Sequence, residues 1–175
     1  MAIDYTRSEI DVVIDLIRQD NQNRTLTSSQ VTFGTPSVYT PIAGVNRNTL
    51  MVGTAVAGRG YEGSQSFYYN RVRLVDFVDP DTTSLEFTIT DEVNLSDLLP
   101  AINERLNINL TASKIIDKPL PDLSANLSAN IELKVTFDSM VYLGSLILEV
   151  QPELIPLSAY LPVTDLNGLT YEPVV

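Results

Sequence analysis

Strict alternation of apolar and polar residues is the feature of this 175-residue chain that most constrains its fold. It is clearest at residues 130–137, Asn-Ile-Glu-Leu-Lys-Val-Thr-Phe, and at residues 84–90, Ser-Leu-Glu-Phe-Thr-Ile-Thr. A period of two places alternate side chains on opposite faces of a strand, so both runs predict half-buried strands of an antiparallel sheet. Composition and turn residues predict further strands at residues 30–33, 50–56, 66–78 and 141–150.

Two short segments carry the helical period instead. In the first, Ser8 is a candidate N-cap with Asp11 three residues on, and the helix runs to about Asp20. In the second, Ser96 is the candidate cap, and Pro100 falls in the first turn, where its missing N–H costs little. The apolar positions that define the two helices are Ile10, Val13, Ile14 and Ile17, and then Leu98, Leu99, Ile102 and Leu106.

These elements predict an α+β fold, mostly antiparallel β as a sandwich or sheet, with two short helices packed on it. We expect one mixed domain over residues 1–150, followed by an extended Pro-rich C-terminal arm over residues 151–175. Residues 61–64 (Tyr-Glu-Gly-Ser) are echoed by residues 142–145 (Tyr-Leu-Gly-Ser), and residues 23–31 are echoed by 107–115. An internal duplication with halves near 1–92 and 93–150 would explain the echoes, and so would chance similarity of two helix-to-strand turns.

Three glycines, Gly58, Gly60 and Gly63, match the spacing of the dinucleotide-binding fingerprint. That fingerprint requires a helix after the glycines, because the helix N-terminus holds the pyrophosphate. Residues 66–75 are instead rich in aromatic and β-branched residues, which favours a strand. The glycines are therefore predicted to form a hairpin turn that uses positive φ, and no cofactor is expected.

Composition argues against most chemistry. The chain has no histidine and no cysteine, which excludes Ser-His-Asp triads, thiol nucleophiles and Cys-based zinc sites. Its net charge of −11 repels nucleic acid and anionic membranes, and no apolar run is long enough to span a bilayer. The acidic start Met-Ala-Ile-Asp argues against a signal peptide. The carboxylates of Asp76, Asp79 and Asp81 are interpreted as a solvated turn rather than a calcium site, so no metal is expected.

A resemblance to a known family adds to this interpretation. Its residues are Leu16-Ile17-x-x-Asp20-Asn21-x-Asn23-x-x-Leu26-Thr27-x-x-Gln30-Val31-Thr32-Phe33-Gly34-x-Pro36, then Asn48-Thr49, Gly60-Tyr61-x-Gly63-Ser64 and Tyr69-Asn70-Arg71-Val72, and finally 95–103 leading to Asn109-Leu110-Thr111. Over roughly residues 8 to 150 the chain resembles a module of virion structural proteins of large tailed bacteriophages.

The resemblance implies a non-enzymatic virion component, made in the bacterial host cytoplasm and present in many copies. Its partners would be other virion proteins and copies of itself, at the head surface as a decoration protein, at the neck, or at the tail or fibre attachment. The C-terminal arm is the candidate docking segment, because its apolar residues would be unfavourable in water. The candidate subunit contacts are Leu154, Ile155, Leu157, Tyr160 and Leu161.

Two other functions stay open on the sequence alone. One is a soluble β-sandwich that binds a carbohydrate or another ligand, which predicts a single concave pocket. The other is a carboxylate-based hydrolase, which predicts two carboxylates in one cleft.

Overall fold

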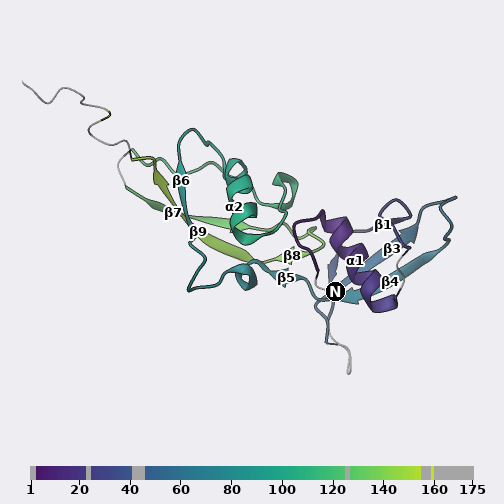
Figure 1. Ribbon diagram of the computed structural model, residues 1–175. Coiled ribbons are helices and arrows are strands. Elements are labelled where there is room, and N and C mark those ends of the chain that lie inside the picture. The colour runs from purple at the N-terminus through teal and green to yellow at the C-terminus, as the bar shows by residue number, and fades with distance from the viewer. Residues whose placement is uncertain (1–2, 23–24, 41–45, 125–126, 155–158, 160–175) are drawn as a thin grey trace, which may run out of the picture.

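The computed structural model describes residues 3–22, 25–40, 46–124, 127–154 and 159. They form two lobes side by side, each with a helix packed on a small sheet (Figure 1). We call helix α1 with strands β1 to β4 the N-lobe, and helix α2 with strands β6, β7 and β9 the C-lobe. Most strand pairs are antiparallel, so the predicted α+β fold with two helices on mainly antiparallel sheets is confirmed.

The N-lobe helix α1 (Glu9–Asn21) begins and ends as its sequence predicts. The Oγ of Ser8 accepts the Asp11 N–H at 3.3 Å, and Gln22 ends the helix with a left-handed φ of +52°. The apolar side chains that α1 buries are Val12, Val13, Ile14 and Ile17, whereas Ile10, which the helical period also assigned to this face, is exposed. They cover one face of the sheet formed by β1 (Val31–Phe33), β2 (Ser37–Val38), β3 (Thr49–Ala55) and β4 (Ser64–Tyr69).

Strand β3 is central in the N-lobe sheet. It pairs with β4 along one edge, while β1 and β2 share its other edge. The hydrogen bond from the Ala55 N–H to the Gly63 carbonyl (3.0 Å) sets which residues of β4 bond to β3 and which direct their backbone groups away from it. Since the pattern alternates along an antiparallel pair, Gln65, Phe67 and Tyr69 bond to β3, and the intervening residues of β4 turn their N–H and C=O groups outward.

The C-lobe places helix α2 (Leu99–Leu106) on a three-stranded sheet of β6 (Glu86–Ile89), β9 (Ser145–Pro152) and β7 (Ala129–Lys134), in that order. Strand β7 is antiparallel to β9, and β6 is parallel to it. Short 3-10 helices lie at Leu74–Phe77 (η1), Leu95–Leu98 (η2) and Ala112–Lys114 (η3). Strands β5 (Val72–Arg73) and β8 (Tyr142–Leu143) pair in parallel between the lobes.

The two lobes repeat one backbone arrangement in their hairpins. Each hairpin closes on a glycine with positive φ, +81° at Gly63 and +86° at Gly144. The closing bonds match, from Ala55 N–H to the Gly63 carbonyl (3.0 Å) and from Val135 N–H to the Gly144 carbonyl (3.1 Å). In sheet position, β3 therefore corresponds to β7 and β4 corresponds to β9.

The turns after the two helices match as well. The Gln30 N–H bonds the Thr27 carbonyl (3.0 Å), as the Lys114 N–H bonds the Thr111 carbonyl (2.9 Å). The Gln30 and Lys114 carbonyls then accept the N–H groups of Val56 and Thr136, respectively. A common origin of the two lobes stays a prediction. Strand β6 already belongs to the C-lobe sheet, so the change of lobe falls before residue 86 rather than at the expected boundary near 92.

Four sequence-based expectations need correction. The strand predicted over residues 66–78 ends at Tyr69, because the Asn48 side chain accepts the Arg71 N–H (2.9 Å) where a ladder bond would continue. The strand predicted over 141–150 is divided at Gly144 into β8 and β9, and the one predicted over 130–137 ends at Lys134.

The fourth correction concerns the start of the second helix. Ser96 does not cap it, since its hydroxyl donates to Asp117 (2.7 Å). The 3-10 helix η2 precedes α2, and its N-cap is Asn94, whose N–H donates to the Asp97 carboxylate (2.8 Å); α2 itself follows Leu98, which makes no side-chain cap bond. Pro100 does lie in the first turn of α2, as expected.

Candidate functional site

Where the lobes meet, a buried carboxylate ties α1 to the loop between β7 and β8. Glu9 lies in the first turn of α1, and its carboxylate accepts hydrogen bonds from the Ser139 hydroxyl and from the Met140 N–H (2.9 Å). The Ser139 oxygen in turn accepts the Tyr142 N–H (3.0 Å). Because a buried carboxylate requires donors for its oxygens, these bonds hold the N-lobe helix on the C-lobe.

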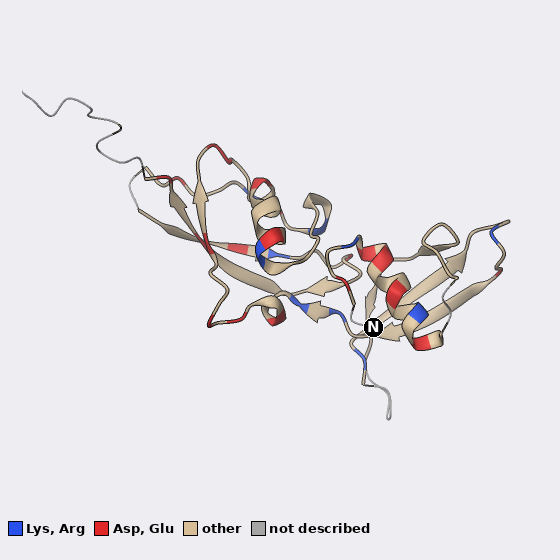
Figure 2. Cartoon of the chain, in the orientation of Figure 1, with Lys and Arg blue, Asp and Glu red and all other residues tan. Residues whose placement is uncertain are grey.

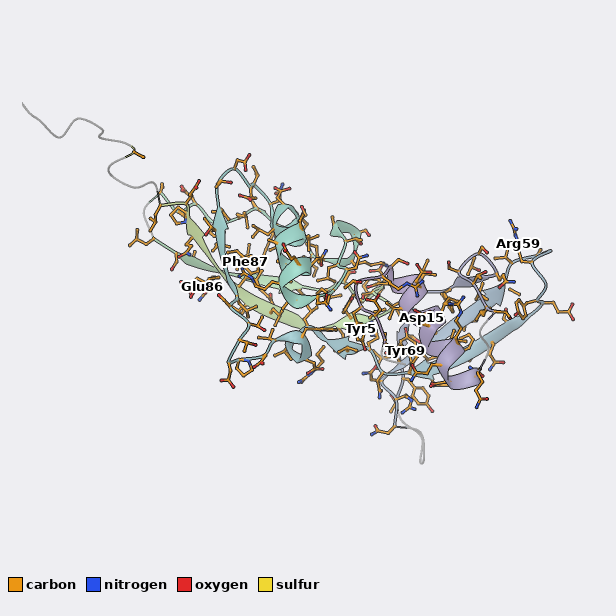
Figure 3. All side chains as sticks on the ribbon, in the orientation of Figure 1. Tyr5, Asp15, Arg59, Tyr69, Glu86 and Phe87 are labelled. Carbon is orange, nitrogen blue, oxygen red and sulfur yellow. The ribbon has the colours of Figure 1, made fainter. Side chains whose placement is uncertain are left out.

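Aromatic rings fill the rest of this junction. Tyr142 is fully buried, its ring lies 5.8 Å from that of Phe77, and its hydroxyl donates to the Tyr5 carbonyl (3.0 Å). The Tyr69 hydroxyl donates to the Met140 carbonyl (2.6 Å), so Tyr5 and Tyr69 both lie at the contact between the lobes (Figure 3). Burial raises the pKa of Tyr142 to about 12 and raises the pKa of Tyr69 as well, so both hydroxyls are neutral donors at physiological pH.

Arg71 holds the same loop from the other side. Its guanidinium donates to the Thr49 hydroxyl (3.0 Å) and to the carbonyls of Phe137 and Ser139 (both 3.0 Å). Among the described residues it makes no ion pair with a carboxylate. The side chain therefore supplies both geometry and an uncompensated positive charge.

An apolar depression opens beside this loop. We call it the junction depression, and it has a volume of about 510 Å³. Its principal lining residues are Ile116, Val135, Phe137 and Leu143, with Arg71 and Lys134. Phe137 comes directly after Thr136, whose N–H bonds the Lys114 carbonyl. Phe137 is 79% exposed.

The charge around the junction depression differs from that of the whole chain. Arg71 and Lys134 both line it, and neither forms an ion pair within the described part of the chain. Asp138 also lines the depression, and its carboxylate accepts a hydrogen bond from Lys114 at 2.8 Å. That hydrogen bond from Lys114 is the main reason why the pKa of Asp138 is lowered. A chain with a net charge of −11, whose acidic residues are spread over both lobes (Figure 2), thus carries two unpaired cations beside an apolar surface at its junction.

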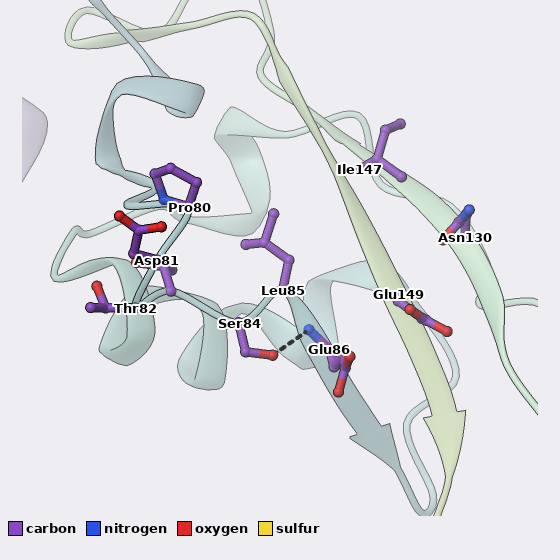
Figure 4. Close-up of a pocket in the computed structure, with 10 residues that line it drawn as sticks. Pro80, Asp81, Thr82, Ser84, Leu85, Glu86, Asn130, Ile147 and Glu149 are labelled. Carbon is purple, nitrogen blue, oxygen red and sulfur yellow. Dashed lines mark hydrogen bonds between the residues drawn. The ribbon is translucent and has the colours of Figure 1, made fainter.

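A second, polar cleft lies on the outer face of the C-lobe sheet (Figure 4). The turn that starts at Asp79 forms one wall, and β6, β7 and β9 form the other. Its carboxylates are those of Asp81, Glu86 and Glu149, and no aromatic side chain lines it. Within the described residues, no group of three or more His, Cys, Asp or Glu side chains is arranged to hold a metal ion.

The predicted hairpin glycines lie together in the loop between β3 and β4. Gly58, Gly60 and Gly63 have φ of +75°, +91° and +81°, and a Cβ at any of them would meet nothing within 4 Å. The strand β4 follows the glycines, in the place where a dinucleotide-binding site has the helix that holds the pyrophosphate. In the acidic turn, the Asp79 carboxylate accepts the Asp81 N–H at 3.0 Å, which is the local role expected of such a residue.

Of the candidate subunit contacts, Leu154 is described and lies exposed at the end of β9. Ile155, Leu157, Tyr160 and Leu161 lie outside the described residues. The residues that the sequence did not single out are Phe137 and Lys134 of the junction depression. Their signal was the overlong alternating run at 130–137, which suggested a strand where the chain in fact turns away from the sheet.

Comparison with protein families gives one match. Residues 2–173 match the model described as a family of unknown function, DUF7941. Neither the curated proteins nor the solved structures contain a match. None of the helices in the described residues has the length and apolar character needed to cross a membrane.

Proposed function

The chain belongs to DUF7941, a family of unknown function, and we propose that its role is structural: a non-enzymatic, multi-copy assembly component of a tailed-phage virion. In this proposal the C-terminal arm of one copy docks on the junction depression of the next. The particle location would be the head surface, the neck, or the tail or fibre attachment.

The observation that carries the proposal is the match between the junction depression and the arm. The depression is apolar and bordered by Arg71 and Lys134. Residues 151–175 are rich in Leu, Ile, Val and Tyr, contain Glu153, Asp165 and Glu172, and have no Lys or Arg. An apolar, anionic segment and an apolar, cationic surface are complementary both in the area they would bury and in charge.

The position of the arm favours docking between copies over docking within one copy. The arm leaves β9 at the end opposite to Ser145, which is the end next to the junction. To reach its own depression it would have to return along the sheet, where Glu132 and Glu149 alternate away from the core. Those carboxylates repel an anionic segment. An arm that docks on the depression of a neighbouring copy does not have to pass them.

The resemblance to virion structural proteins gives the setting of the proposal. A ligand-binding module is the second candidate. The polar cleft is its most suitable site, but sugar-binding clefts generally stack an aromatic ring on the sugar, and this cleft is lined by none.

Self-association of the purified chain tests the proposal. We expect sedimentation velocity to show concentration-dependent oligomers for the full chain, and monomers with a cooperative melt after deletion of residues 155–175. Phe137→Asp should weaken association by roughly tenfold or more, because it removes an exposed apolar anchor. Ile147→Asp is the matched control, since Ile147 is also exposed but lies outside the depression.

A full chain that stays monomeric at every concentration, or equal effects of the two Asp substitutions, would contradict arm docking. The setting is tested separately by a mass-spectrometric protein list of purified phage particles. The chain should be present there in many copies.

A further inference from the structure

Strand β6 of the C-lobe shows what the edge of this repeated unit can bind. It lies parallel to β9, with the Glu149 N–H bonded to the Leu85 carbonyl (2.9 Å). Its Phe87 side chain is buried between α2 and the sheet. Arg105 of α2 lies over the Phe87 ring, 4.2 Å from its centroid, and donates to the Glu86 carbonyl. An added strand thus inserts one aromatic side chain beneath the helix.

The N-lobe has the same edge without such a strand. Strand β4 takes the place of β9, and its Ser64, Ser66 and Tyr68 direct backbone N–H groups away from β3. Within the described residues no strand pairs with that edge. The Ser66 carbonyl accepts the neighbouring Gln65 side chain at 3.2 Å.

A groove lies between this edge and α1, and it ends at Tyr69, the residue that corresponds to Val150, the partner of Phe87 on β9. Its volume is about 290 Å³. Its apolar walls come from Val13, Leu16 and Ile17 of α1 and from Phe67 and Tyr69 of β4. Ile3 and Tyr5 cover only the far end of the edge, near Asn70 and Val72.

The charge at the groove specifies the occupant. Asp20 borders the groove. It lies two residues before Gln22, the left-handed residue that ends α1. Arg105 lies at the corresponding position of α2, two residues before the left-handed Asn107. Arg105 binds carbonyl groups of β6, whereas a carboxylate at that position attracts a cation. Asp20 forms no ion pair with any described residue, whereas Asp11 and Asp15 of α1 are paired with Arg7 and Arg18, so Asp20 is the carboxylate that borders the groove. The C-terminal arm is anionic and is therefore a poor occupant.

We propose that the groove between α1 and β4 is a docking site for an extended, cationic strand of another protein. The strand adds in parallel to the open edge of β4 and inserts an aromatic or large aliphatic side chain between α1 and Phe67, as β6 inserts Phe87. Recognition by main-chain bonds with one side-chain pocket is a general mode of strand addition. The site goes beyond the proposed self-assembly. It lies on the N-lobe between α1 and β4 rather than at the junction depression, and it selects a cationic segment rather than the anionic arm.

The test uses the full chain and two synthetic peptides of residues 83–90, one with the natural sequence and one with Glu86→Lys. We expect the Lys peptide to bind up to about fivefold more tightly, the upper end of the range for an exposed charge contact. On binding, it should slow hydrogen exchange at the Ser66 and Tyr68 amides. Ser66→Pro removes an outward N–H without breaking the pairing with β3, and it should abolish binding.

A charge exchange completes the test. Asp20→Lys should reverse the preference, so that the natural peptide binds better than the Lys peptide. Glu104→Lys makes the same charge change on the exposed face of α2 and should leave the preference unchanged. The proposal is overturned if the Lys peptide does not bind, if it binds without protecting Ser66 and Tyr68, or if the two Lys variants of the protein behave alike.

Discussion

The N-lobe and the C-lobe follow the same path of helix, turn and hairpin, yet they fill the space beneath the helix differently. In the C-lobe, Leu133 points from β7 into the core and is fully buried. The corresponding residue of β3 is Gly53, and the rings of Phe33 and Phe67 occupy the space that its side chain would take. In the C-lobe the edge is completed by β6, and in the N-lobe it is open. The comparison teaches that one backbone arrangement can support a closed unit and a unit open to a partner.

The largest changes in the free energy of unfolding are expected at Leu133 and Gly53, where the packing of the two lobes differs. Leu133→Ala should lower the free energy of unfolding by about 2–5 kcal/mol, because it leaves a cavity in the C-lobe core. Gly53→Ala makes the opposite change at the corresponding site, where the new Cβ would lie 2.8 Å from Phe67 and 3.1 Å from Phe33. Overpacking of this kind should cost about 1–3 kcal/mol. Urea denaturation measures both, and a neutral Gly53→Ala would show that the N-lobe core is loosely packed.

The next largest loss of stability is expected at the Glu9 contact that joins the lobes. Glu9→Ala leaves the buried Ser139 hydroxyl and the Met140 N–H without their acceptor, so we expect a loss of about 1.5–3 kcal/mol. The two lobes should then melt less cooperatively in differential scanning calorimetry. Asp11→Ala, on the same helix but at its exposed side, is the control. An unchanged melting profile for Glu9→Ala would mean that apolar contacts alone couple the lobes.

The two hairpin glycines give a matched pair of smaller effects. Gly63→Ala and Gly144→Ala both place a Cβ on a residue with positive φ, and neither Cβ meets another atom within 4 Å. The cost should therefore be backbone strain alone, about 1 kcal/mol in each lobe. Thermal denaturation of the two variants should give nearly equal shifts. A difference of more than twofold would break the equivalence of the hairpins.

The smallest effect concerns pH. The pKa of Asp138 is lowered in the folded chain, chiefly by the hydrogen bond from Lys114, so the ionised form is favoured. Its contribution is fully present above the unfolded pKa of about 3.9 and is lost as pH falls through the folded pKa. Both side chains are partly exposed to water, which screens the pair, so the contribution should be below about 1 kcal/mol.

Lys114→Gln should remove this part of the acid dependence in unfolding curves between about pH 2 and 5. Between about pH 6 and 8 the stability should be nearly constant, since the chain has no histidine. A steep change in that range would point to a strongly shifted carboxylate elsewhere.

Much of this fold follows from local patterns in the sequence. The Ser8 cap, the apolar face of α1 and the alternation in β6 and β7 are all decided by neighbours along the chain. The strand ends are not. β4 stops at Tyr69 because Asn48, distant in the sequence, takes the next backbone bond, and β9 starts where Gly144 adopts positive φ.

The candidate sites were harder to predict for the same reason. Residues Arg71, Lys134 and Phe137 come together only because β5 and β8 pair between the lobes. The echo of residues 61–64 at 142–145 pointed to related hairpins, but no pattern in the sequence shows that one hairpin edge is filled by β6 and the other is open. That difference depends on a parallel pairing between distant segments, which has no local signal.

The central claim is that the β4 edge is open where the β9 edge is filled, and site-resolved hydrogen exchange of the free chain by NMR tests it most directly. The Glu149 amide donates to Leu85, so it should exchange slowly, close to the rate set by unfolding of the C-lobe. The corresponding Tyr68 amide, which faces away from β3, should exchange at least about a hundredfold faster. Equal protection of the Tyr68 and Glu149 amides would mean that the N-lobe edge is already occupied, and the account of an open docking strand would be wrong.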